Sequence, residues 1–179
     1  MHRKTTFAKD DILKCGTGEL DGVEYPRLPL PNMLMLDRIT HISDEGGKYG
    51  RGEVTAEFAV NPDSWFFACH FRDDPVMPGS LALDGLCQLL GFFLGWKGYK
   101  GKGRAFGIGE VKYRGEILPT SGIISYRLDI KKIVHSSITM AIADGEILLK
   151  GQVVHTAKSL RVGIVPYLKN PASRHIKDR

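Results

Sequence analysis

Residues 81–96, LALDGLCQLLGFFLGW, form the longest apolar stretch of the chain and decide its fold. At about 100° per residue on an ideal helix, the large apolar side chains cover most of the circumference. The remaining narrow stripe is small or weakly polar and consists of Ser80, Asp84, Cys87, Gln88, Gly91 and Gly95. Such a helix is typical of a protein core, and its stripe allows a neighbouring backbone or a ligand to approach closely. The pattern alone leaves both uses of the stripe open.

The rest of the chain predicts mainly strands. Before the central helix we expect a helix at 8–14 ended by Gly16, a short strand within 33–42, and a strand at 49–60. After it we expect strands at 105–113, 123–133, 138–143, 146–150 with 152–158, and 160–164. Asp144-Gly145 indicates a hairpin turn, and Gly151 a bulge or bend. One long apolar helix followed by antiparallel strands predicts an α+β fold with the helix packed on a curved sheet.

Length and composition narrow the class of protein. The 179 residues predict one domain over 1–166 and a basic, flexible tail over 167–179. The net charge of +5 is too small to indicate nucleic-acid binding. Three cysteines indicate a reducing compartment, and no apolar run reaches the roughly 20 residues of a membrane span. We therefore expect a cytoplasmic protein that binds neither nucleic acid nor a membrane.

Two titratable residues flank a loop in the most apolar part of the chain. Asp84 is the only charged residue between Asp74 and Lys97, so it must find a partner or become protonated. His70 lies among aromatic residues in WFFACHF. Each could be purely structural, Asp84 bonded to backbone amides and His70 packed in the core. The loop between them, 74–79, leads into a helix N-terminus whose free N–H groups could donate to a developing oxyanion.

A base, an acid and an oxyanion donor are the parts needed to abstract a proton next to a carbonyl group. Other chemistries lack their motifs, because the chain contains no nucleophile elbow, no phosphate-binding loop and no dinucleotide fingerprint. The histidines and cysteines show no metal-ligand spacing. We expect neither a metal nor a cofactor.

Several short segments, in the same order along the chain, resemble one known family from about residue 10 to residue 164. They are Pro31-Asn32-Met33-Leu34-Met35, Trp65-Phe66-Phe67 with Cys69-His70-Phe71, Asp74-Pro75-Val76-Met77-Pro78-Gly79, Leu83-Asp84, Gln88-Leu89, Gly91-Phe92, Leu94-Gly95-Trp96, Gly101-Lys102-Gly103-Arg104-Ala105 and Ala143-Asp144-Gly145-Glu146. The family is the 3-hydroxydecanoyl-acyl carrier protein dehydratase/isomerase of bacterial type II fatty acid synthesis.

The resemblance implies a hot-dog fold, an antiparallel sheet wrapped around the central helix, in a homodimer with shared active sites. It implies that His70 of one subunit is the base and Asp84 of the other the acid. The Gly79 amide would polarise the thioester carbonyl, and the Val76 carbonyl would orient the imidazole. We also expect substrate contacts from two further residues, Phe71 and Gln88.

The implied reaction is dehydration of a 3-hydroxyacyl group on acyl carrier protein, with medium chains near 3-hydroxydecanoyl preferred, and isomerisation to the cis-3 product. An aspartate at position 84, where related dehydratases without isomerase activity usually have glutamate, favours the bifunctional branch. The chain departs from the family at Arg72-Asp73 and at Ala82, Gly85, Leu86 and Cys87. These departures leave open which acyl chain length is preferred and what the ratio of isomerase to dehydratase activity is. A hot-dog acyl thioesterase and a non-catalytic acyl-carrier or lipid-binding module are the alternative functions.

A cluster of positive charge follows the central helix. We expect Lys97, Lys100, Lys102 and Arg104 to form a docking patch for the acidic carrier protein. The alternative is a solvated loop whose cations merely suit the C-terminal end of the helix dipole.

Overall fold

The computed structural model describes residues 3–20 and 25–167. In this part of the chain, seven antiparallel strands form one sheet in the order β1-β2-β5-β6-β7-β3, and β4 also pairs with β7. The elements are α1 (Lys9–Thr17), β1 (Arg38–Ser43), β2 (Glu53–Ala59), α2 (Gly79–Trp96), β3 (Lys102–Gly107), β4 (Glu110–Tyr113), β5 (Ile123–His135), β6 (Thr139–Leu149) and β7 (Gln152–Val165).

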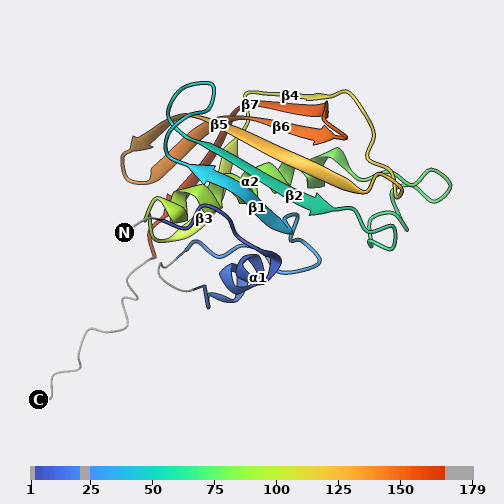
Figure 1. The fold of residues 1–179 in the computed structure, drawn as a ribbon, viewed down its shortest axis with the longest axis horizontal. Helices are drawn as coiled ribbons and strands as arrows, with labels where there is room; N and C mark the ends of the chain where they lie inside the picture. The colour runs from blue at the N-terminus through green and yellow to red at the C-terminus, as the bar shows by residue number, and fades with distance from the viewer. Residues whose placement is uncertain (1–2, 21–24, 168–179) are drawn as a thin grey trace, which may run out of the picture.

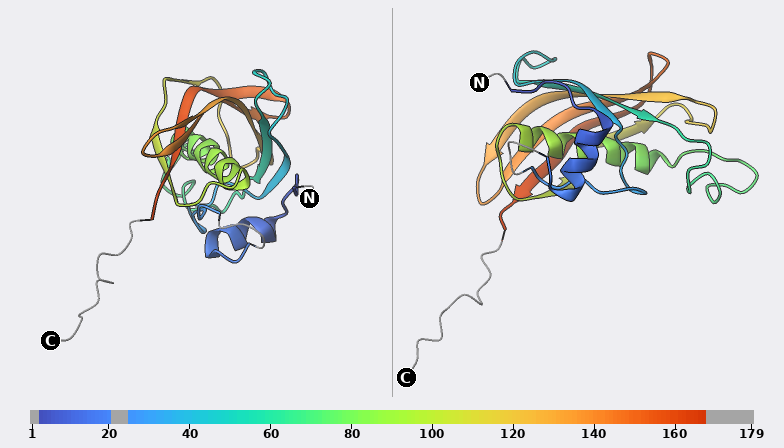
Figure 2. Two further views of the ribbon diagram at one scale, coloured as in Figure 1. Left: turned by 90° about the vertical axis from the view of Figure 1, so that its left-hand side faces the viewer. Right: turned by 60° about the horizontal axis from the view of Figure 1, so that its bottom comes forward.

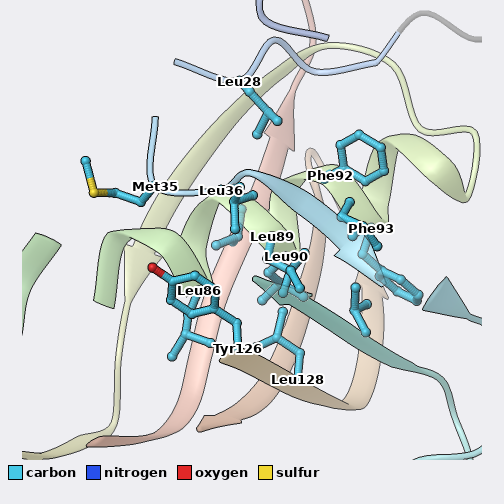
Figure 3. Close-up of a cluster of buried hydrophobic side chains, with 14 of the residues drawn as sticks. Leu28, Met35, Leu36, Leu86, Leu89, Leu90, Phe92, Phe93, Tyr126 and Leu128 are labelled. Atoms are coloured by element: carbon cyan, nitrogen blue, oxygen red, sulfur yellow. The ribbon is translucent and has the colours of Figure 1, made fainter. Parts of the chain in front are cut away.

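The sheet curls around α2, which Figure 2 shows end-on inside the strands, while α1 lies outside the sheet (Figures 1 and 2). Figure 3 shows the core that results, with Leu86, Leu89 and Leu90 of α2 buried beside Tyr126 and Leu128 of β5. By length and composition alone α2 could cross a membrane, but 67% of it is buried inside the protein, as in a core helix. The predicted α+β architecture, a helix wrapped by an antiparallel sheet, is confirmed.

The hairpin turn predicted between strands at 138–143 and 146–150 is wrong. Asp144-Gly145 does not turn but lies within β6, and the chain reverses instead at Lys150 and Gly151, with φ of 50° and 80°. Two successive positive φ values are typical of a tight two-residue hairpin. Gly145 serves a different purpose, since a Cβ there would lie 2.8 Å from Cδ1 of Leu86. Its missing side chain lets α2 approach the sheet.

Other predicted boundaries of helices and strands also differ from those in the structure. The first helix passes through Gly16 and ends at Thr17, where Gly18 closes it with a φ of 84°. The strand expected within 33–42 begins only at Arg38, and the strand expected from 49 begins at Glu53. The strand expected at 105–113 is divided into β3 and β4, and the two strands expected at 152–158 and 160–164 are a single strand, β7. Except for Tyr167, the predicted tail lies outside the described residues.

Candidate active site

His70 lies in the segment between β2 and α2, which is green in Figure 1 and extends beyond the end of the sheet. Its imidazole is half-buried, and Nδ1 lies 2.9 Å from the carbonyl oxygen of Val76. A carbonyl only accepts hydrogen bonds, so Nδ1 carries the hydrogen and neutral His70 has its free lone pair on Nε2. The Phe71 ring stacks on the imidazole with the centroids 4.1 Å apart. This arrangement leaves Nε2 able to accept a proton.

Backbone bonds hold the histidine segment in a compact loop. The N–H of His70 donates to the Phe66 carbonyl at 2.8 Å, and the His70 carbonyl accepts from the N–H of Val76 at 2.9 Å. The N–H of Met77 then donates to the carbonyl of Ile117 at 2.8 Å, which ties the loop to the segment after β4. The residue that orients the imidazole is therefore itself held by the loop.

Gly79 is the first residue of α2, and the preceding N-cap, Pro78, makes no side-chain capping bond. The first N–H groups of a helix have no partner within the helix and carry the positive end of its dipole. The Tyr113 ring covers this helix start so closely that a Cβ on Gly79 would lie 2.5 Å from its Cε1. A glycine at this position leaves room for the Tyr113 ring. Among the described residues no hydrogen bond occupies the Gly79 N–H, which could therefore donate to a negatively charged oxygen.

Asp84 lies in the second turn of α2 and is half-buried. Its Oδ2 accepts a hydrogen bond of 2.7 Å from Nε2 of Gln88, one helical turn further on. Among the described residues, no hydrogen bond reaches its other oxygen, Oδ1. The partner of this carboxyl group is thus a side chain, not the backbone amides of the structural alternative.

A cavity of about 180 Å³ opens beside Asp84. The polar stripe of α2 forms one wall, and the connector before β1, strand β3 and Val162 of β7 form the others. Its lining residues are Pro26, Arg27, Leu28, Pro29, Asp84, Cys87, Gln88, Gly91, Gly103, Arg104, Ala105 and Val162. The stripe predicted to pack tightly or to receive a ligand therefore faces an open space.

His70 and Asp84 do not meet within one chain. In the described part of the structure no hydrogen bond or ion pair joins them, and His70 does not line the cavity beside Asp84. A reaction that needs both residues requires a second chain or a large movement of the loop.

The four predicted docking residues are not equivalent. Lys97 forms an ion pair of 2.9 Å with Asp44, and Arg104 lines the cavity beside Asp84. Lys100 and Lys102 are exposed, and Nζ of Lys102 lies 5.9 Å from the centre of the Tyr167 ring.

Two tyrosines near these residues could not be predicted from the sequence. Tyr113 covers the start of α2, and the buried Tyr126 has its hydroxyl against Gly85, beside Asp84. Each belongs to a strand with alternating polarity, which gives no sign that it contacts the helix. Among the described residues there is no group of three or more His, Cys, Asp or Glu side chains that could hold a metal ion.

A buried helix inside a curled antiparallel sheet, with a histidine loop that leads into the helix and a carboxylate on its second turn, defines a hot-dog domain of the dehydratase type. Residues 28–158 match the family model described as FabA-like domain, and the chain belongs to this family of hot-dog dehydratases.

Among the solved structures that resemble the chain, two serve as examples. One is the dehydratase heterocomplex ApeI:P from Xenorhabdus doucetiae, at 20% identity and a TM-score of 0.60 over 78% of this chain and 87% of the other. At that identity it shows the fold. The second is AziG from S. sahachiroi, at 12% identity and a TM-score of 0.49 over 72% of this chain and 90% of the other.

Proposed function

We propose that the protein dehydrates (3R)-3-hydroxyacyl groups on acyl carrier protein to trans-2-enoyl groups. The observation that carries the proposal is the contact between Nδ1 of His70 and the Val76 carbonyl, which leaves Nε2 as a base on the loop that leads to Gly79. Medium chains near 3-hydroxydecanoyl are the preferred substrates, and the trans-2 product is isomerised in part to the cis-3 product. The reaction takes place in the cytoplasm and needs no cofactor.

In this mechanism, His70 and Asp84 move the two protons of the dehydration. Nε2 of His70 takes a proton from C2 of the acyl chain, and the electron pair of that C–H bond moves toward the thioester carbonyl. The Gly79 N–H stabilises the enolate-like oxygen, an effect worth roughly 3–4 kcal/mol for comparable donors. The C3–O bond then breaks as Asp84 protonates the departing hydroxyl, which leaves as water. The resulting imidazolium and carboxylate return to their starting states when one proton passes back.

A homodimer with shared sites would bring His70 of one subunit to Asp84 of the other. At one edge of the sheet, β1 is covered by the N-terminal segment, since Phe7 and Ile39 exchange two hydrogen bonds of 2.9 Å. At the other edge, the outer side of β3 pairs with no strand among the described residues, and Phe106 on it is 47% exposed. An uncovered edge strand is a surface on which a second chain can pair. This edge borders the cavity that Asp84 lines.

The test is incubation of the purified protein with the 3-hydroxydecanoyl thioester, followed by quantification of the trans-2 and cis-3 products. We expect both products from the wild type, and neither from His70→Ala or Asp84→Ala at unchanged oligomeric state. Release of free thiol without enoyl product would instead indicate a thioesterase. Binding of acyl carrier protein without any product would indicate a non-catalytic module.

A further inference from the structure

Tyr113, whose ring covers the start of α2, lies opposite His155 in the pairing of β4 with β7 (Figure 1). The two rings meet edge to face, with their centroids 5.0 Å apart and their planes at 85°. Aromatic pairs prefer this geometry. Tyr113 is 54% exposed, whereas His155 is 4% exposed. The buried imidazole is therefore a fixed support for a ring that is otherwise largely open to solvent.

The backbone fixes the imidazole of His155 in turn. Its Nδ1 lies 2.6 Å from the carbonyl oxygen of Val154 and carries the hydrogen, because a carbonyl only accepts. The same carbonyl accepts the N–H of Arg114, the residue after Tyr113, at 2.8 Å. One carbonyl thus holds both the imidazole and the backbone beside the tyrosine. Burial lowers the pKa of His155, so the imidazole is neutral at neutral pH and acts through its shape.

The Tyr113 ring shields one side of the start of α2. A Cβ on Gly79 would lie 2.5 Å from Cε1 of the ring and 2.7 Å from Cδ1, so no water fits between the ring and this part of the backbone. A hydrogen-bond donor stabilises a developing charge more strongly where water is excluded. The position of the ring therefore affects how strongly the Gly79 N–H can stabilise an oxyanion.

We propose that His155 is a positioning residue for the oxyanion site: it holds the Tyr113 ring over Gly79, and the ring excludes water from the side of the helix that it covers. The inference rests on the proposed dehydration, in which the Gly79 N–H stabilises the enolate-like oxygen. It assigns no proton transfer to His155, whose imidazole is buried in the sheet. A displaced ring would admit water to the donor without removing the donor itself.

The experiment compares kcat and KM for dehydration in two variants at position 155. His155→Phe keeps an aromatic ring against Tyr113, whereas His155→Leu fills the space with an apolar side chain that has no ring. Loss of an oxyanion donor costs about 100-fold to 1,000-fold in kcat, and a donor exposed to water keeps part of its effect. We expect His155→Leu and Tyr113→Ala each to lose about 10-fold in kcat, with KM within about twofold of the wild type. His155→Phe should recover most of the loss.

A double variant tests whether His155 acts through the tyrosine. His155→Leu combined with Tyr113→Ala should lose no more kcat than Tyr113→Ala alone, because the support has no effect once the ring is absent. Multiplied losses would overturn the proposal. The matched control is His135→Ala, which removes a histidine from a second contact of this kind, with Tyr99 at a centroid distance of 5.4 Å. Its kcat should equal that of the wild type.

Three further results would contradict the role of His155. Equal losses in His155→Phe and His155→Leu would mean that the imidazole itself is required and not the ring. A raised KM at unchanged kcat would identify a substrate contact, and a lower melting temperature at unchanged kcat and KM would identify an ordinary core residue. If His155→Leu does not fold, Tyr113→Ala decides, since an unchanged kcat without the ring overturns the proposal. A wild type without dehydration would instead refute the proposed function.

Discussion

At the scale of single residues, Tyr126 is the exception to the rule that buried polar groups are paired. Its hydroxyl is the one buried side-chain polar atom without a hydrogen-bond partner among the described residues. Burial, and then the negative charges of Asp84 and Asp37, raise the pKa of this phenol, so it stays protonated. A buried hydroxyl without a partner costs roughly 1–3 kcal/mol of desolvation.

Tyr126→Phe should therefore stabilise the protein. We expect the free energy of unfolding to rise by about 1 kcal/mol, because the substitution removes an unpaired polar atom and keeps the ring. Urea denaturation of the two proteins measures the difference. Tyr49→Phe is the matched comparison, because its hydroxyl donates to Asp144 and its removal should destabilise. A clear loss of stability in Tyr126→Phe would mean that the hydroxyl has a partner in solution.

The three cysteines should differ sharply in reactivity. Burial raises the pKa of Cys87 to about 12 and that of Cys15 to about 11, whereas Cys69 is exposed. Because the thiolate is the reactive form, iodoacetamide at pH 8 should alkylate Cys69 in the native protein and the other two only after unfolding. Peptide mapping by mass spectrometry gives the extent at each site. Equal labelling of Cys87 and Cys69 in the native protein would contradict the burial of the α2 thiol.

At the scale of elements, Asp144 joins three strands and a loop. It is 5% exposed on β6, and Oδ1 accepts from Nζ of Lys131 at 2.8 Å and from the N–H of Ser159 at 2.9 Å. Oδ2 accepts from the Tyr49 hydroxyl at 2.7 Å and from Nζ of Lys158 at 3.3 Å. Burial alone would raise the pKa of Asp144, but these four donors hold it well below its usual range. The carboxylate is thus ionised at neutral pH and links β5, β6 and β7 to the loop at Tyr49.

Asp144→Asn should cost about 2 kcal/mol of stability at pH 7. A broken buried pair typically costs roughly 3–5 kcal/mol, but the two lysines reach solvent, which weakens the pairs. Since the folded-state pKa is depressed, the contribution of the carboxylate is complete above an unfolded pKa of about 4 and disappears as the pH falls toward the folded value. The difference between variant and wild type should therefore be smaller at pH 3 than at pH 7 in urea denaturation.

Asp129→Asn provides the control for this pH dependence. Asp129 lies opposite Asp144 in the pairing of β5 with β6, and its exposed carboxylate accepts one backbone hydrogen bond of 2.8 Å from Lys48. We expect a much smaller loss of stability there. An Asp144→Asn cost that stays the same at pH 3 would show that lost packing, and not lost charge, is responsible.

The same elements show how far the sequence predicts the structure. Helix α2 could be predicted almost to the residue, because its apolar run is long and its start is marked by Pro78 and Gly79. The position of the hairpin turn could not be predicted. Gly145 is not a turn residue but makes room for Leu86, which is far away in sequence. The partners of Asp144 are also remote, Tyr49 being 95 residues away. Local patterns predict an element, whereas such contacts depend on the finished fold.

The candidate site shows the same difference between local patterns, which can be predicted, and contacts between residues distant in sequence, which cannot. The motifs place His70, Val76 and Gly79 on one short loop, where local backbone bonds bring the Val76 carbonyl to the imidazole. The hydrogen bonds of the Gln88 amide to the connector at Met33 and Met35 could not be predicted, because they span more than 50 residues. Distance along the chain, more than residue type, limits what could be predicted.

At the scale of the whole molecule, docking of the carrier protein should depend on the exposed lysines after α2. We expect Lys100→Glu with Lys102→Glu to raise KM for the carrier-bound substrate several-fold and to leave KM for the N-acetylcysteamine thioester unchanged. Charges at the rim of an interface act mainly on association, and salt screens them. Steady-state kinetics on both substrates at low and high salt provides the measurement. Lys97 is left intact because it pairs with Asp44. Equal losses on the two substrates would point to a role in the fold.

The assembly itself can be tested by mixing inactive proteins. His70 and Asp84 lie apart in one chain, and the uncovered β3 edge borders the cavity at Asp84. If two subunits share each site, the His70→Ala and Asp84→Ala homodimers are both inactive, but a mixed dimer has one complete site and one that lacks both residues. Random exchange makes about half of the dimers mixed, so activity should recover to about a quarter of the wild-type value.

Exchange must be shown independently, by native mass spectrometry of subunits with different masses. Each variant mixed with itself should remain inactive, which excludes recovery by refolding alone. Exchange without recovery would place both residues in the same site of a single chain. The loop at His70 would then have to move toward α2, because no hydrogen bond or ion pair joins the two side chains in the described structure. Recovery of about a quarter of the wild-type activity requires instead that the His70 loop of one subunit reaches helix α2 of the other. Each folded chain then contains only part of an active site, and the dimer completes it.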